Sequence, residues 1–144
     1  SMGYPDSENE ISILKGKAEK NAPENLSTVV STEQFLYLKN MVNDVFVHDA
    51  IYRYIVGLSD KTRNNPALLL GLSPRGSIAL CSMAKARAFM EGRQYVLPED
   101  VMAIFSDVSA HRIVLSPSAR LEKKTAQDVL REVLSLVKAP KVKV

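Results

Sequence analysis

The stretch from Gly71 to Val101, GLSPRGSIALCSMAKARAFMEGRQYVLPEDV, constrains the fold of this chain more than any other part. Ser73 is suited to cap a helix with its side-chain oxygen. Pro74 suits the first helical position, where a backbone N–H would have no partner. Gly92 is the kind of residue that ends a helix. The sequence therefore predicts a long helix between Pro74 and Gly92, and a second helix that begins at Pro98.

Apolar residues occupy most of the predicted helix from Ile78 to Met90. A helix that is apolar nearly all round is normally buried, so this pattern predicts the central helix of a bundle. At about 100° per residue, Arg75, Ser82 and Lys85 fall within an arc of roughly 80° and form the one polar stripe. Arg75 lies in the first turn, where the helix dipole is positive and disfavours a cation. We infer that Arg75 has an anionic partner nearby.

The other segments also predict helices joined by short connections. The predicted fold class is therefore all-α, a helical bundle with a few very short extended segments. Further helices are expected over residues 4–20, after the capping box Ser31-Thr32-Glu33-Gln34, and from Asp49 and Thr125. Extended pieces are expected at 28–30, 45–47 and 95–96, and a break in the chain at Pro117. Residues 66–72 are expected to form a loop whose leucines Leu68, Leu69 and Leu70 are held against the core.

Apolar side chains at helical spacing are expected to face the core. Helix by helix they are Phe35, Leu38, Met41, Val42 and Val45; Ile51, Tyr54, Ile55 and Leu58; Val101, Ile104, Phe105 and Val108; and Leu130, Val133, Leu134 and Val137. The tyrosines Tyr37 and Tyr52 are expected in the core or at its edge. His111 is expected near the packed face at the end of a helix.

At 144 residues the chain is long enough to bury a real core, and we predict one domain over residues 1–144. Within it, residues 3–20 would form a hinge and the first helix, and residues 139–144 a flexible basic tail. Much of the net charge of +3 comes from Lys138, Lys141 and Lys143 near the C-terminus, so a nucleic-acid partner is not expected.

The cysteine and histidine content excludes several kinds of site. The single cysteine, Cys81, cannot form an internal disulfide and suits a reducing, cytoplasmic location. Its apolar surroundings favour an inert thiol. One cysteine and two distant histidines do not make a zinc site, so no metal site is predicted. No apolar run approaches the length of a membrane span, and no signal peptide is visible.

The 71–101 stretch resembles the sensor-2 segment of the MoxR family of AAA+ ATPases. That segment carries a G-x-S-P-R-[AG]-S helix start and then a G-R-x-Y-V-x-P-E-D-V turn and helix. The opening Gly3-Tyr4-Pro5-Asp6 resembles the junction between ATPase core and lid, and His111 to Leu115 resembles the H-R-[IL]-x-L segment near the end of such lids. The family usually has Thr or Ser where Leu97 stands. The resemblance covers residues 3–137 and implies a C-terminal helical lid.

The resemblance implies roles for four residues. Arg75 would be the sensor-2 arginine that reaches the phosphates of the nucleotide. Three other residues would lie near the nucleotide: Pro74, Ile78 and Tyr4, with Tyr4 at the adenine end. Pro74 also suits the helix start. Core packing would explain Ile78 equally well.

The resemblance also implies a larger parent protein. Such parents form rings, commonly hexamers, that bind ATP with Mg²⁺ between subunits. They help to assemble or activate other proteins, often alongside proteins with von Willebrand factor A domains. The lid would couple ATP hydrolysis to this chaperone-like remodelling through its own ATPase core and the neighbouring subunits.

This chain lacks the phosphate-binding loop G-x-x-x-x-G-K-[ST], so alone it is not expected to hydrolyse ATP or to bind it tightly. Three alternatives remain open. The chain could be a stand-alone helical protein-interaction domain, in which Arg75 makes a surface salt bridge. It could be the lid of another AAA+ ATPase, such as a magnesium chelatase type subunit. A basic helical nucleic-acid binder would show affinity that falls steeply with salt.

Overall fold

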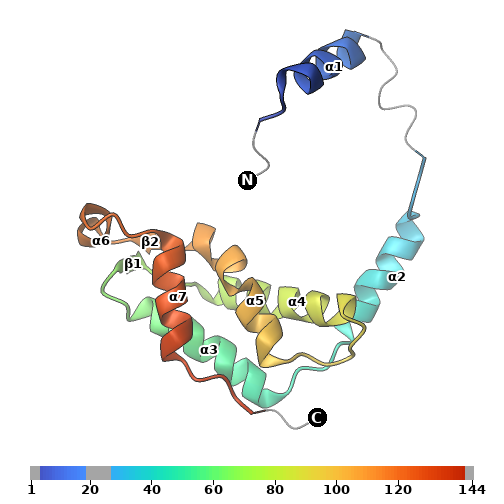
Figure 1. The fold of residues 1–144 in the computed structure, drawn as a ribbon. Helices are drawn as coiled ribbons and strands as arrows, with labels where there is room; N and C mark the ends of the chain where they lie inside the picture. Colours follow the sequence, from blue (N-terminus) through green and yellow to red (C-terminus); the bar gives the residue numbers. More distant parts are fainter. Residues whose placement is uncertain (1–3, 19–26, 142–144) are drawn as a thin grey trace. The chain divides into compact units, whose positions relative to one another are not determined.

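The computed structural model describes residues 4–18 and 27–141 of the chain, and Figure 1 shows their fold. The elements in order are α1 (Ser7–Ala18), α2 (Thr32–Asn43), α3 (Asp49–Arg63), β1 (Leu68–Leu70), α4 (Pro74–Met90), α5 (Pro98–Ser109), the 3₁₀ turn η1 (Ala110–Arg112), β2 (Val114–Leu115), α6 (Pro117–Leu121) and α7 (Ala126–Leu136). The predicted all-α class is confirmed, since the described ranges are mainly helical and hold one two-stranded sheet.

The chain divides into two compact units, Ser1–Phe35 and Leu36–Val144. The single domain over residues 1–144 stays a prediction. In the first unit α1 falls within the predicted 4–20 helix, and Asp6 caps it by accepting a 2.8 Å hydrogen bond from the Asn9 backbone N–H. The capping box at the start of α2 is confirmed. The Gln34 N–H donates to the Ser31 hydroxyl at 3.1 Å, and the Ser31 N–H donates to the Gln34 side chain at 2.9 Å.

The core of the second unit lies between α3, α4, α5 and α7, which pack on one another (Figure 1). The inward face of α3 is as predicted, because Ile51, Tyr54, Ile55 and Leu58 are all buried. In α5 and α7 the predicted positions Val101, Phe105, Val108, Leu130 and Val133 are buried, and Ile104, Leu134 and Val137 pack at the edge. Burial of these side chains is the main force that stabilises the unit.

Helix α4 is buried on one face only, which corrects the prediction of a helix enclosed all round. Its buried residues Gly76, Leu80, Ala84 and Ala88 recur every fourth position. Three of the four are small, so α5 packs closely along this stripe. Apolar side chains on the rest of the helix are exposed because α3 and α5 cover only one side; they include Ile78, Met83 and Met90 at 66%, 49% and 78%.

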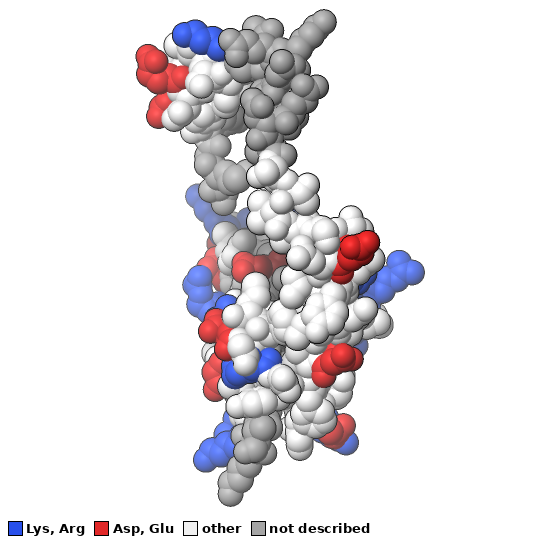
Figure 2. All heavy atoms as spheres, turned by 90° about the vertical axis from the view of Figure 1, so that its right-hand side faces the viewer, with Lys and Arg blue, Asp and Glu red and all other residues white. Residues whose placement is uncertain are grey.

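Helix α2 differs from the prediction of a core-facing apolar side. None of its residues is buried, and the expected core residues Phe35, Leu38 and Met41 are exposed. The reason is that no described helix or strand packs broadly against α2. Only Val45, just beyond its end, is buried. Figure 2 shows the side of the molecule that includes α2, where charged side chains of both signs are scattered among mostly uncharged atoms.

A small sheet replaces part of the predicted loop over 66–72. Strand β1 pairs antiparallel with β2, with Leu68 opposite Leu115 and an irregularity in the register beside it. Of the three leucines only Leu68 is buried, whereas Leu69 and Leu70 are 73% and 58% exposed. A strand presents its residues to alternate faces, and the register irregularity here disturbs that alternation, so a run of leucines cannot all face the core.

Two other connections are partly as predicted. The extended pieces at 45–47 and 95–96 meet in a parallel bridge between Phe46 and Tyr95. Pro117 was predicted to break the chain, but it begins the short helix α6, in which the Ser116 hydroxyl accepts a hydrogen bond from the Ala119 N–H. Proline is well suited to the first helical position, so the same residue ends one element and begins another.

The turn between α4 and α5 is closed by an ion pair. Gly92 has a φ of 73° and, as predicted, ends α4; the Gly92 and Arg93 N–H groups donate to the Phe89 and Ala88 carbonyls, each at 2.9 Å. The Arg93 guanidinium then forms two hydrogen bonds, of 2.8 and 2.6 Å, with the Asp100 carboxylate. These hydrogen bonds raise the pKa of Arg93 above its usual value.

Asp100 also compensates for the unusual Leu97. The Leu97 side chain cannot cap α5, but the Leu97 N–H donates to the Asp100 carboxylate at 2.8 Å. This is the returning half of a capping box. Helix α5 therefore starts as predicted without the threonine or serine that the resemblance led us to expect.

Candidate functional site

The candidate site lies at the start of α4, where the sequence placed Arg75. The Ser73 backbone is extended, its hydroxyl accepts a hydrogen bond from the Gly76 N–H at 3.3 Å, and Pro74 opens the helix, as predicted. Arg75 follows and is exposed. Within residues 4–18 and 27–141 no ion pair involves Arg75. The anionic partner inferred from the sequence is therefore not found among these residues.

Three of the four predicted site residues lie in the first two turns of α4. Pro74 and Arg75 are exposed, and Ile78 is 66% exposed. Ile78 lines an apolar groove between α3 and α4 that also includes Tyr52, Val56, Cys81, Ser82 and Lys85. The fourth predicted residue, Tyr4, belongs to the first unit, where its side chain is fully exposed.

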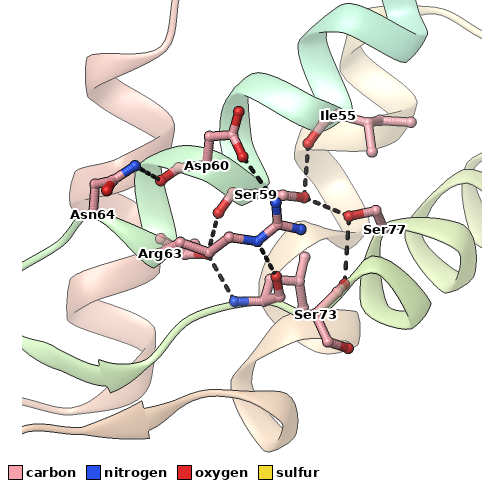
Figure 3. A network of polar contacts seen from close by, with 9 residues as sticks. Ile55, Ser59, Asp60, Arg63, Asn64, Ser73 and Ser77 are labelled. Atoms are coloured by element: carbon pink, nitrogen blue, oxygen red, sulfur yellow. Dashed lines mark hydrogen bonds and ion pairs between the residues drawn. The ribbon is translucent and has the colours of Figure 1, made fainter.

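Side chains at the end of α3 hold the segment that leads into α4 (Figure 3). The Leu72 N–H donates to the Thr62 hydroxyl at 2.8 Å, and that hydroxyl donates to the Ser59 carbonyl at 2.6 Å. The Arg63 Nε–H donates to the Leu72 carbonyl at 2.8 Å, and Arg63 also pairs with Asp60 at 2.8 Å. Both backbone polar groups of Leu72 are thus satisfied by side chains of α3.

A second contact joins α3 directly to the first turns of α4. The Ser59 hydroxyl donates to the Ile55 carbonyl at 2.9 Å and lies 2.7 Å from the Ser77 hydroxyl. Figure 3 shows the Ser77 side chain pointing from α4 toward Ser59 on α3. Because Ser59 is fully buried and Ser77 is half-buried, this contact is partly shielded from water and links the two helices directly.

Two glycines allow the backbone to pass at close range. A Cβ atom on Gly71 would lie 2.5 Å from the Arg63 nitrogen and 2.7 Å from the Thr62 carbonyl carbon. A Cβ on Gly76 would lie 2.4 Å from the Leu72 side chain, which is itself fully buried. Only glycine is compatible with this packing, so the route of the chain from α3 into α4 is tightly defined.

Two further arginines lie near the start of α4, although Asp60 offsets the charge of one of them, Arg63, at 2.8 Å. Arg63 donates to Leu72, and the Arg112 side chain passes within 3.6 Å of the position that a Gly76 Cβ would occupy, while its Nε–H donates to the Val108 carbonyl at 3.0 Å. Arg75 and the positive end of the helix dipole, with the Arg112 side chain nearby, favour an anionic ligand. His111 beside Arg112 is exposed, which corrects its predicted place near the packed face.

The remaining polar residues of α4 have structural surroundings. The Lys85 ammonium donates to the Asn43 carbonyl at 2.7 Å, so it contacts the end of α2. Burial raises the pKa of the Cys81 thiol, and Lys85 opposes this only in part, which agrees with the predicted inert thiol. Of the tyrosines predicted in or near the core, Tyr54 is buried, but Tyr37 and Tyr52 are 66% and 47% exposed.

Sequence reasoning missed Thr62 and Arg63. A threonine and an arginine in the last turn of a helix are common, and their partner Leu72 follows nine or ten residues later, beyond any local helical pattern. The one available signal was Gly71, because a glycine before a helix start often marks a close backbone approach.

No group of three or more His, Cys, Asp or Glu side chains in the described part of the chain is arranged to hold a metal ion. None of the helices in this part is long and apolar enough to cross a membrane.

Comparisons with known proteins agree with this arrangement. The AAA lid domain family matches residues 60–133, about half of the chain. A Bacillus subtilis protein, YeaC, is 39% identical over 96% of this chain and 43% of its own length. Chaperone MoxR1 of Mycobacterium tuberculosis is 31% identical over 99% of this chain and 40% of its own length.

The crystal structure of a proposed ATPase from Cytophaga hutchinsonii has a similar fold. Its TM-score is 0.79, its sequence identity 31%, and the match covers 97% of this chain and 45% of that one. The chain thus spans less than half the length of these relatives. The family match includes α4 with its Arg75 start, the ion-paired turn and α5. The chain belongs to the AAA lid domain family, as a lid of the MoxR type of AAA+ ATPase.

Proposed function

We propose that this chain is the lid of an ATPase in which Arg75 binds the phosphates of ATP as a sensor-2 arginine. The observation that carries the proposal is that Arg75 is exposed at the positive end of α4, without an ion-pair partner among the described residues. A cation in the first helical turn is unfavourable by itself. A phosphate group would relieve that cost, and it is the ligand that helix starts and arginine both favour.

The chemistry expected of Arg75 is electrostatic. Its planar guanidinium can hold two oxygens of the γ-phosphate and stabilise the charge that develops during phosphoryl transfer. Pro74 and Ile78 would contact the nucleotide beside it, and Tyr4 its adenine end. Mg²⁺ bound to ATP would neutralise the other phosphate oxygens, held by residues outside this chain.

This role would make lid position depend on the state of the nucleotide. After hydrolysis and release of the γ-phosphate, Arg75 loses its ligand, and the lid no longer has this contact to hold it. A ring of such subunits, hexameric in the family, would pass that change to neighbouring subunits and to client proteins, with von Willebrand factor A domain proteins as candidate partners. Chaperone-like remodelling is the output that we propose.

The test is ATP turnover by the full-length protein that contains this chain. We compare wild type with Arg75→Ala and Arg75→Lys, and with Arg53→Ala as a matched control. Arg53 is an exposed arginine in the first turns of α3, 2.6 Å from Asp49, whereas the contacts with the segment before α4 come from the last turn of α3. We expect Arg75→Ala to reduce kcat on the order of 10³-fold, in the range of arginines that contact a transferring phosphoryl group.

Arg75→Lys should restore little of the lost turnover, because a lysine ammonium cannot bind two phosphate oxygens at once as a guanidinium does. Arg53→Ala should leave turnover unchanged. Ring assembly is followed by light scattering, so that loss of the oligomer is not mistaken for loss of chemistry. Unchanged turnover in Arg75→Ala, with the fold and ring intact, would refute the phosphate contact.

One observation favours a second candidate, a protein-interaction domain. The apolar residues Leu36, Tyr37, Leu38 and Met41 of α2 are all exposed. If this surface rather than Arg75 carried the function, Leu38→Asp would abolish partner binding and leave ATP turnover at the wild-type rate. A combined loss of assembly and turnover would instead place α2 at a contact within the ATPase.

A further inference from the structure

Leu72 is held in an unusual way for a residue that precedes a helix. Loops before helices are commonly fixed by local turns and caps, with partners two to four residues away. Here the Leu72 N–H and carbonyl are bound by Thr62 and Arg63, ten and nine residues earlier, at 2.8 Å each. Thr62 is fully buried, so its hydrogen bond is shielded from water and strengthened accordingly.

The segment between Leu72 and Arg75 is tightly packed. The Leu72 side chain is fully buried and lies directly under Gly76, and Ser73 caps the helix between them. On the other side of Leu72, the Gly71 backbone is pressed against the backbone of Thr62 and Arg63. A change at the end of α3 would therefore be transmitted to the first turn of α4, and so to Arg75.

We propose that Thr62 and Arg63 are positioning residues, which fix Arg75 in the orientation that a phosphate group requires. This inference rests on the phosphate contact of Arg75 proposed above. Thr62 holds the Leu72 N–H from inside the core, and Arg63 holds the Leu72 carbonyl from the surface, where its side chain is 39% exposed. Neither residue needs to contact the nucleotide.

A small displacement of Arg75 is expected to cause a large loss of catalytic rate. A misplacement of about 1 Å in a catalytic group lowers rates by as much as 10²-fold. Loss of the Arg63 hydrogen bond would free the Leu72 carbonyl to rotate, three residues ahead of Arg75. We expect Arg63→Met to lower kcat/KM for ATP by about 10-fold, within that range.

The experiment is a double-mutant cycle in the full-length protein. It combines Arg63→Met with Arg75→Ala, and Arg53→Met, on the exposed side of the same helix, is the control. Thr62→Val, which leaves a buried N–H unpaired, is paired with Thr62→Ser, which keeps the hydroxyl. Each variant is measured for kcat, KM, the Kd of a fluorescent ATP analogue, and melting temperature.

If Arg63 acts through Arg75, its loss has little further effect once Arg75 is gone. We expect Arg63→Met to change kcat/KM and the Kd by less than about 2-fold in the Arg75→Ala background, the usual limit of additivity errors. In the wild-type background, the smaller loss caused by Arg63→Met should divide between kcat and KM in the same ratio as the loss caused by Arg75→Ala. Thr62→Ser should retain activity and Thr62→Val should lose it.

Three results would overturn the proposal. Equal losses from Arg63→Met in both backgrounds would show that Arg63 acts independently, as a direct phosphate contact does. Full activity in both Arg63→Met and a folded Thr62→Val would show that the attachment does not matter. If activity falls in proportion to melting temperature in every variant, including Arg53→Met, the effect is a general loss of structure. If Arg75→Ala itself is fully active, the failure lies in the proposed function and not in the attachment.

Discussion

Replacing Asp100 by asparagine should destabilise the lid strongly, although the two side chains have nearly the same shape. The Asp100 carboxylate is 3% exposed and accepts both hydrogen bonds from Arg93 as well as the Leu97 N–H. Asparagine keeps one acceptor oxygen and turns an amide NH₂ toward an Arg93 donor. The result is a guanidinium without its counter-charge in a site where only 23% of its side-chain surface reaches water.

The expected loss follows from these contacts. Breaking a buried ion pair by removing one partner costs about 3–5 kcal/mol, because the other charge stays behind. Arg93 can turn partly to solvent, so we place Asp100→Asn near the lower end, at about 3 kcal/mol. For a unit of this size that corresponds to a fall in melting temperature of about 10 °C. Asp107→Asn, on the exposed side of the same helix, should change stability by less than about 0.5 kcal/mol.

The assay is urea unfolding of residues 1–144 at pH 7, followed by circular dichroism. The Arg93 contribution does not vary near that pH. Because its hydrogen bonds to Asp100 raise the folded-state pKa of Arg93 above its usual value, the stabilisation is fully present at pH 7 and is lost only as the pH rises through that raised pKa. A second variant, Arg93→Met, and the double variant close a cycle whose coupling should be about 2 kcal/mol. A loss under 1 kcal/mol for Asp100→Asn, or a coupling near zero, would refute this account of the turn.

Three further predictions concern stability of the same chain. Gly92→Ala should lower the free energy of unfolding by about 1–2 kcal/mol in urea unfolding, because Gly92 has a φ of 73°, although nothing would contact a Cβ there. Gly57→Ala, inside α3, should instead raise the free energy of unfolding by about 0.5–1 kcal/mol. Equal effects of the two substitutions would contradict this conformational explanation. Tyr54→Phe should leave stability unchanged or raise it by up to about 1 kcal/mol, since the buried hydroxyl has no partner among the described residues, and a clear loss would reveal one. Hydrogen bonds from Thr125 lower the pKa of Asp128 below 3.8, so wild-type stability should fall as pH drops through that value, and Asp128→Asn should flatten the decline in an acid titration.

The helix boundaries of the second unit could be predicted because their signals are local. Ser73, Pro74 and Gly92 each act within one turn of their own position, and the structure places them at the two ends of α4. The same holds for the Thr125 cap of α7. The apolar faces of α3, α5 and α7 followed from periodicity alone, since each of these helices packs on one side of the core.

The errors arose where the outcome depends on a distant partner. The apolar side of α2 predicted burial, yet no described element covers it. Periodicity records which side of a helix is apolar and not whether another element is present to cover it. Leu68 to Leu70 could not be assigned because strand β1 exists only through pairing with β2, more than forty residues later.

The site divides in the same way. Arg75 could be found from its position in a helix start and from the resemblance, but Thr62 and Arg63 act across nine and ten residues. Nothing in their own neighbourhood distinguishes them from ordinary residues at a helix end. Only the folded chain shows that they hold Leu72.

The two attachments of α4 support one mechanical interpretation of the proposed function. At its start, Thr62 and Arg63 hold Leu72; at its end, Arg93 and Asp100 tie the turn to the first residues of α5. A helix of 17 residues is about 25 Å long and resists bending. With both ends held by these contacts, we expect that movement of Arg75 toward or away from a phosphate group is not absorbed by a local hinge. It would carry α3, α4 and α5 together, which is what a lid must do to turn loss of a phosphate contact into a displacement of the whole domain.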